Sequence, residues 1–199
     1  MKLFMFCVAL ILSSFLLANA QNRPIDYQFR FLMHLQIVEP GKTFGVAAWG
    51  IIPDATQKIS KYFLVTGLVV KGDTTRWVEV MGGGYTKERD FLPAADIRSN
   101  IDFLKYGVSA FAEALCSFRE KRLILLPNVT KNFHIGNFKI GVGGESDIIF
   151  ERDKKLSCGF GPRIAISWPW RQSKISLATG YQRTNGDFDI LRSYLTLNF

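Results

Sequence analysis

The chain has 199 residues, a formal net charge of +8 and a mean hydropathy of only +0.10. Its seventeen Phe and seventeen Gly residues favour strands and tight turns over a helical bundle. This length allows one domain with a sizeable core, and the composition excludes a disordered chain, a collagen and a disulfide-rich miniprotein.

Residues 1–20 are expected to be an export signal. Lys2 is followed by an apolar stretch from Leu3 to Leu17 and then by Ala18-Asn19-Ala20, the order found in signal peptides. A membrane anchor is the alternative, but the apolar core is short. Beyond residue 20, the longest stretch without a charged residue or His is Thr43–Pro53, eleven residues, which is too short for a spanning helix.

Cysteine and histidine content indicates no metal site. The mature chain keeps Cys116 and Cys158, and the sequence leaves open whether they pair in an oxidising compartment. There is no CxxC motif, and the two histidines, His34 and His134, lie far apart in the chain. We therefore expect neither a metal nor another cofactor.

Alternation of apolar and polar residues predicts most of the secondary structure. From Tyr27 to Ile37 the odd positions are apolar and most even positions are polar, which predicts a strand with one apolar face. Residues 138–168 repeat this pattern on two arms joined by a polar turn at 152–155, which predicts a long hairpin. A second hairpin, Lys174–Phe199, is expected around Asn185-Gly186.

Further strands are expected earlier in the chain. These are Phe44–Ile52, Lys61–Lys71, Arg76–Thr86 and a weaker strand, Leu123–Thr130, that Pro127 interrupts. The glycines at 82–84 and 141–144 predict curved strands rather than phosphate loops.

One segment has a helical spacing. Apolar residues recur every three or four positions within residues 96–120, which predicts an amphipathic helix; they are Ile97, Ile101, Leu104, Val108, Phe111, Leu115 and Phe118. The alternative is a strand over residues 100–112. With both alternatives open, the expected number of strands is eight to ten.

The same alternation fits a soluble β-domain and a membrane β-barrel. Short turns and aromatic residues near strand ends favour the barrel; the aromatic residues are Tyr27, Trp49, Trp77, Trp168, Trp170, Tyr181 and Phe199. The predicted outward faces of three strands carry no charge, whereas their opposite faces carry Arg30, Lys139 and Arg163. A one-residue shift would place these cations in lipid, at about 2–4 kcal/mol each.

The last residues carry a resemblance to a known class. Leu195 and Leu197 alternate with polar residues before the aromatic Phe199. Here the sequence resembles bacterial outer-membrane β-barrel proteins, whose last strand ends in an aromatic residue and helps the insertion machinery recognise the protein. The close match covers roughly the last ten residues, while the signal peptide and the alternation extend it weakly over the chain.

The resemblance implies an outer-membrane protein with an insertion signal at Leu195, Leu197 and Phe199. Together with the alternation, it predicts an all-β fold: a single antiparallel up-and-down β-barrel of eight to ten strands over residues 21–199, with one amphipathic helix around 96–120 as an option. The expected partners are outer-membrane lipid, lipopolysaccharide and the barrel-insertion machinery. No nucleic-acid motif is present, and the oligomeric state is left open.

The inward faces are expected to form a polar network in the lumen; its members are Arg30, His34, Lys139, Glu145, Asp147 and Arg163. Side chains largely fill the interior of a narrow barrel, so this network favours a plug over a pore. The predicted function is structural, adhesive or small-solute permeation. One alternative is a soluble periplasmic or secreted β-domain that binds an apolar ligand. The other is an outer-membrane lipid-modifying enzyme with His34 as its base, although no nucleophile motif accompanies His34 and no catalytic residue is assigned.

Overall fold

The computed structural model describes residues 23–38, 45–56, 60–72, 75–87 and 90–199. The predicted signal peptide lies outside the described residues. Strands dominate the described part, with one short 3-10 turn, η1 (Leu104–Tyr106), and no α-helix. In these residues, no helix has the length and hydropathy that crossing a membrane requires.

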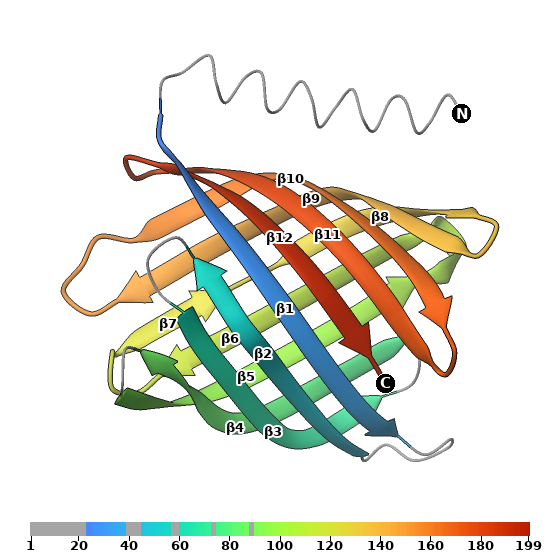
Figure 1. The fold of residues 1–199 in the computed structure, drawn as a ribbon, viewed down its shortest axis with the longest axis horizontal. Coiled ribbons are helices and arrows are strands. Elements are labelled where there is room, and N and C mark those ends of the chain that lie inside the picture. Colours follow the sequence, from blue (N-terminus) through green and yellow to red (C-terminus); the bar gives the residue numbers. More distant parts are fainter. Residues whose placement is uncertain (1–22, 39–44, 57–59, 73–74, 88–89) are drawn as a thin grey trace.

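The strands follow one another in chain order (Figure 1). Their bounds are β1 Ile25–Val38, β2 Gly45–Thr56, β3 Ser60–Gly72, β4 Arg76–Lys87, β5 Asp90–Phe103, β6 Val108–Ser117, β7 Arg122–Leu125, β8 Asn128–Ile135, β9 Phe138–Glu151, β10 Ser157–Trp170, β11 Ser173–Thr184 and β12 Asp189–Asn198. β7 and β8 both pair with β6 on one side and β9 on the other, so they are two halves of one strand. Pro127 lies between them and has no N–H to give to the ladder, as the sequence predicts. The described strands therefore number eleven.

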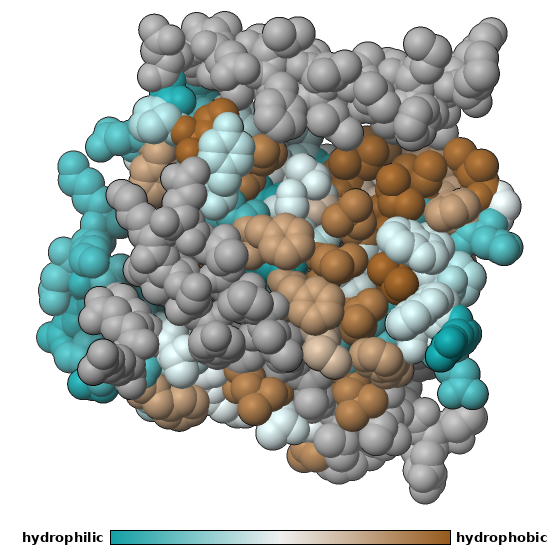
Figure 2. All heavy atoms as spheres, in the orientation of Figure 1, coloured by the Kyte–Doolittle hydropathy of each residue, from teal (hydrophilic) through white to brown (hydrophobic). Residues whose placement is uncertain are grey.

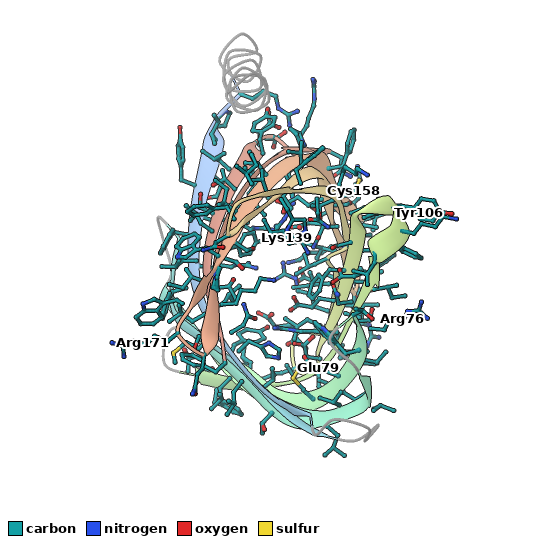
Figure 3. All side chains as sticks on the ribbon, turned by 90° about the vertical axis from the view of Figure 1, so that its right-hand side faces the viewer. Arg76, Glu79, Tyr106, Lys139, Cys158 and Arg171 are labelled. Atoms are coloured by element: carbon teal, nitrogen blue, oxygen red, sulfur yellow. The ribbon has the colours of Figure 1, made fainter. Side chains whose placement is uncertain are left out.

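The strand pairings form a closed circuit, which we call the ring. Consecutive strands pair antiparallel, including β9 with β10, and β12 pairs with β1. The end-on view shows the strands around a central space (Figure 3). We name its two ends by the chain: β1 begins at the entry end, and β12 ends at the exit end. The predicted all-β, up-and-down, mainly antiparallel fold is confirmed.

The contact between the last and first strands is present but parallel. Tyr27 lies opposite Leu191, and Met33 lies opposite Leu197. Each hairpin reverses the chain, so the first and eleventh strands of an odd-numbered ring run in the same direction. The structure thus has one strand more than the eight to ten expected, and its closing pair differs from a fully antiparallel arrangement.

The helix expected around 96–120 is absent, and strands β5 and β6 occupy this segment. Ile97 and Ile101 point outward from β5, whereas Phe111 on β6 lines the interior. The chain turns between the two strands at η1 and Gly107, whose φ is +58°. This turn changes the phase of the pattern, so the apolar residues that share one helical face lie on both faces of the sheet. The strand expected over 100–112 is also only partly right, because the turn divides it.

The distribution of side chains is the reverse of that in a soluble protein: apolar residues lie outside the ring and charged residues lie inside. Large apolar residues are exposed on its outer surface, among them Leu64, which is 63% exposed, whereas Asp96, Arg98 and Arg192 are at most 3% exposed. Figure 3 shows Glu79 and Lys139 inside the ring. In Figure 2, hydrophobic side chains gather over the middle of the visible face and hydrophilic ones toward both ends.

Exposed aromatic side chains lie near both ends of the ring. Those near the entry end are Tyr27, Phe91, Phe118, Phe150 and Phe188. Those near the exit end are Phe103, Tyr106, Phe138, Trp170 and Phe199. Of the aromatic residues singled out in the sequence, Trp77 lines the interior instead, and the side chain of Trp49 is not among those described.

The entry half of the interior is partly filled by an apolar cluster on the β3–β5 wall. Its buried members are Val65, Val69, Met81, Tyr85, Leu92 and Ala94. Close backbone contact shapes the same wall: a Cβ on Gly83 would lie 2.1 Å from the Leu64 carbonyl oxygen. Gly143 is equally constrained, because its Cβ would lie 1.9 Å from the Val129 carbonyl oxygen. These contacts explain glycine at positions 83 and 143, and both glycine tracts lie in strands as predicted.

Candidate functional site

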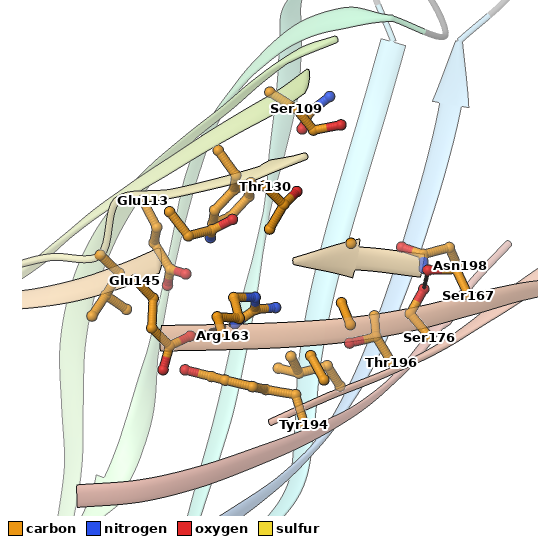
Figure 4. Close-up of a pocket in the computed structure, with 18 of the residues that line it drawn as sticks. Ser109, Glu113, Thr130, Glu145, Arg163, Ser167, Ser176, Tyr194, Thr196 and Asn198 are labelled. Carbon is orange, nitrogen blue, oxygen red and sulfur yellow. Dashed lines mark hydrogen bonds and ion pairs between the residues drawn. The ribbon is translucent and has the colours of Figure 1, made fainter. Parts of the chain in front are cut away.

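A cavity with a volume of about 440 Å³ lies inside the ring. Among the described side chains, its lining comes from β1, β4, β5, β6 and β8 to β12, and is richest near the exit end. The six residues predicted for the lumen network all line it: Arg30, His34, Lys139, Glu145, Asp147 and Arg163. Figure 4 shows part of this lining, with Glu145, Arg163 and Tyr194 projecting toward one another.

An arginine that the sequence analysis did not single out anchors one side of the cavity. Arg192 on β12 binds Asp147 on β9 through both terminal nitrogens, with Nη1 donating to Oδ1 at 2.8 Å. Its Nε donates to Gln28 Oε1 at 2.7 Å. The guanidinium is thus satisfied in a buried position, as a buried charge requires.

A second ion pair joins this cluster. Arg163 on β10 lies 2.5 Å from Glu145 on β9. Gln182 Nε2 bridges the pairs, since it donates to Glu145 Oε1 at 3.1 Å and to Asp147 Oδ1 at 3.0 Å. The Tyr194 ring lies 5.1 Å from the Arg163 guanidinium and 5.9 Å from that of Arg30. This cluster holds β9, β10, β11 and β12 together across the interior.

The opposite wall has its own charge cluster. Arg98 Nε lies 2.7 Å from Asp96 Oδ2, and Arg98 Nη2 lies 2.9 Å from Glu113 Oε1. All three come from β5 and β6, the segment for which the sequence predicted a helix. One arginine therefore binds two carboxylates that would otherwise repel each other.

His34 is held between two acceptors. Its Nε2 lies 2.8 Å from Glu79 Oε1, and its Nδ1 lies 3.2 Å from Asn198 Oδ1. Asn198 Nδ2 points to the Lys174 carbonyl oxygen at 3.5 Å, which leaves the amide oxygen for His34. With both ring nitrogens engaged, His34 connects β1, β4 and β12 rather than presenting a free base to the cavity.

Two lysines line the exit half of the cavity. Lys139 Nζ donates to Ser109 Oγ at 3.4 Å, and Lys174 lies within electrostatic reach of Lys139 and Asp102. Within the described residues, neither ammonium group has a carboxylate oxygen within 4 Å.

Several interior residues are not among those predicted from the sequence, although the alternation of apolar and polar residues indicates that they face inward. Arg192 alternates with Leu191 and Ser193 in the last strand, and Glu79 lies between Val78 and Val80 in β4. Asp96, Arg98 and Glu113 were hidden by the helical interpretation of their segment. Arg98 and Glu113 lie opposite each other on the adjacent strands β5 and β6. The pairings of Arg192 with Asp147 and of His34 with Glu79 join strands that are not neighbours in the ring, and local sequence does not contain that information.

The remaining predicted residues have clear positions. Leu195 and Leu197 lie on the face of β12 opposite the cavity-lining Tyr194 and Thr196, and Phe199 is exposed at the exit end. Their role as an insertion signal stays a prediction. Cys116 and Cys158 are both free. Among the described side chains, no group of His, Cys, Asp and Glu is arranged to hold a metal.

No protein-family model, no curated protein and no solved structure matches the chain.

Proposed function

We propose that the protein is an integral outer-membrane β-barrel with a structural or adhesive role. The observation that carries the proposal is the inverted distribution of side chains. Apolar residues face outward along the strands, while Asp96, Arg98, Glu145, Asp147 and Arg192 are buried inside. Exposing such an apolar surface to water would raise the free energy of the folded protein, whereas in lipid an apolar exterior around a polar interior is favourable.

Strand length and end residues support a membrane-spanning arrangement. Apart from the divided β7–β8 strand, the strands have 10 to 14 residues, and a tilted spanning strand needs about 9–11. The exposed aromatic residues at both ends match the girdles that flank the apolar band of such barrels.

Polar groups on the outer face find partners. Ser193, which interrupts the apolar alternation of the last strand, lies opposite Thr179, and their hydroxyls are 3.1 Å apart. Lys131 on β8 donates to the Tyr106 carbonyl oxygen in the turn at the exit end. Such bonding lowers the cost of a polar group next to lipid.

The strand number departs from the class that the sequence resembles. Bacterial outer-membrane barrels have an even number of antiparallel strands, whereas the ring has eleven and one parallel pair. The proposal therefore depends on the outward and inward faces, and the resemblance of the last strand is secondary.

Interior packing supports some of the expected roles more than others. The apolar cluster and the Arg192 cluster occupy the interior toward the entry end, which supports a plugged lumen over small-solute permeation. Most of the residues that line the cavity are polar or charged, which favours a polar ligand over an apolar one. The engagement of both nitrogens of His34 favours a connecting role over lipid-modifying catalysis.

Cell fractionation tests the proposal. The full chain, expressed in a Gram-negative host, should remain with the outer membrane after a carbonate wash. After detergent extraction it should migrate differently in gels before and after boiling, because a folded barrel resists the denaturing detergent. Recovery in the soluble periplasmic fraction, or a migration that boiling does not change, would overturn the proposal.

A further inference from the structure

The cavity has positively charged groups that its own carboxylates do not neutralise. Three lining carboxylates are in ion pairs with arginines; the pairs are Glu113 with Arg98, Glu145 with Arg163 and Asp147 with Arg192. Asp102, the remaining acidic side chain among the lining residues that the structure describes, accepts a hydrogen bond from Asn100 at 3.3 Å. Among these residues, the single negative charge of Asp102 is left to balance two positive charges, those of Lys139 and Lys174.

The two lysines face the same space from β9 and β11, the strands on either side of β10. Lys139 on β9 lies opposite Ser167 on β10, which lies opposite Ser176 on β11. Lys174 is on the same face of β11 as Ser176, two residues closer to the exit end. Two like charges in a partly dehydrated space repel each other, so an anion placed between them would be attracted to both.

Neutral polar groups surround the lysines. The hydroxyls and amides of the exit half belong to Ser109, Asn132, Ser167, Ser176, Thr196 and Asn198. Ser176 Oγ donates to Ser167 Oγ at 2.9 Å, and Asn132 Nδ2 donates to Ser109 Oγ at 2.6 Å. Each hydroxyl in these bonds keeps further hydrogen-bonding capacity for a ligand.

Aromatic rings complete the wall. Trp77 and Phe111 both line the cavity and meet edge to face, with centroids 6.1 Å apart. The cavity, at about 440 Å³, is within the size range of small-molecule sites, about 300–1,000 Å³. It is far larger than an inorganic ion needs, since one water occupies about 30 Å³.

We propose that this cavity binds an organic anion of monosaccharide size, such as a sugar acid or a sugar phosphate. Lys139 and Lys174 bind its carboxylate or phosphate group, while the serine and asparagine side chains bind its hydroxyl groups. The inference depends on the cavity alone and not on the location of the protein in a membrane. A failure here would therefore leave the result of the fractionation experiment untouched.

Calorimetric titration of the full chain in detergent micelles tests the inference. The probes are glucuronate, glucose 6-phosphate, neutral glucose and inorganic phosphate. We expect at least one of the two sugar anions to bind, and to bind more tightly than glucose or inorganic phosphate. Which one binds identifies the anionic group. Lys139→Gln and Lys174→Gln should each weaken binding by about tenfold or more, because each removes a charge-assisted hydrogen bond.

Two further variants make the result specific. Lys154→Gln removes an exposed lysine in the β9–β10 turn, at the entry end, and should bind like the unchanged protein. Lys174→Arg keeps the charge and should retain most of the affinity, and the boiling-dependent gel shift checks that every variant is folded. The inference is overturned if neither sugar anion binds, if glucose or inorganic phosphate binds as tightly, or if the folded lysine variants bind normally.

Discussion

Single side chains inside the ring connect strands that are far apart in the sequence. Arg192 and Asp147 are separated by 45 positions, as are His34 and Glu79. The buried charged groups described above each have an ion-pair or hydrogen-bond partner, because an isolated charge in this interior would be unfavourable. These contacts select one arrangement of strands across the ring, which the ladder hydrogen bonds of neighbouring strands cannot do.

Arg192→Met is expected to destabilise the fold by about 3–5 kcal/mol, because it leaves Asp147 buried without its main counter-charge. Adding Asp147→Asn to this variant should recover part of the loss, since the uncompensated charge is then gone. Guanidinium unfolding of the protein in detergent measures both. Arg119→Met is the control: its partner Asp90 is exposed, so less than about 1 kcal/mol should be lost. Equal effects of Arg192→Met and Arg119→Met would contradict the role assigned to Arg192.

At the scale of elements, alternation predicts the strands because the side-chain period in a sheet is two. It locates both late hairpins and the strand divided at Pro127. It fails over 96–120, because Ile97 and Ile101, four residues apart, fit a helix and a strand equally well. The inward-facing Asp96 and Arg98 are two residues apart, as a strand requires. After the turn that ends at Gly107, however, the apolar Phe111 also faces inward, so the outward face can no longer be followed by counting from β5.

The candidate site is predictable to a similar extent. The sequence identifies which residues face inward on β1, β9 and β10, and all six predicted residues line the cavity. It does not identify their partners. Arg98 meets Glu113 because the register of the β5–β6 hairpin places them opposite each other. Arg192 meets Asp147 across two intervening strands, because the ring has a particular number of strands and a particular curvature. Both are properties of the whole sheet.

Substitutions at two adjacent glycines in β4 test whether close backbone contact is what requires glycine in this strand. Gly83→Ala should destabilise the fold by roughly 1–3 kcal/mol, because the new methyl group would meet the backbone of Leu64 and Val65. Gly82→Ala should be neutral or slightly stabilising, because nothing lies within 4 Å of its Cβ position. The midpoint of guanidinium unfolding in detergent compares the two. If both variants unfold at the same midpoint, close backbone contact at Gly83 is not what requires glycine.

At the scale of the whole molecule, the distinguishing feature is that the outer face of the ring is apolar and the inner face is polar and charged. A soluble β-domain with this alternation would have an apolar core and a polar exterior, whereas the ring has exposed apolar side chains in the middle of its strands and buried charges inside. The near-neutral mean hydropathy is the sum of these two faces and hides both. Depth along the ring axis is therefore the quantity that separates a membrane-embedded exterior from an ordinary surface.

Two arginine substitutions at different depths along the ring axis test whether the middle of the outer face lies in lipid. Ile97 is exposed at the middle of β5, and Phe118 is exposed in the turn after β6, at the entry end. In lipid vesicles, Ile97→Arg should cost about 2–4 kcal/mol and reduce the folded, boiling-sensitive fraction, while Phe118→Arg should cost about 0–1 kcal/mol, since the penalty falls toward the interface. On a surface that faces water, both would change stability by less than about 0.5 kcal/mol. Equal and small effects in vesicles would therefore place the middle of β5 in water and contradict the membrane-spanning arrangement.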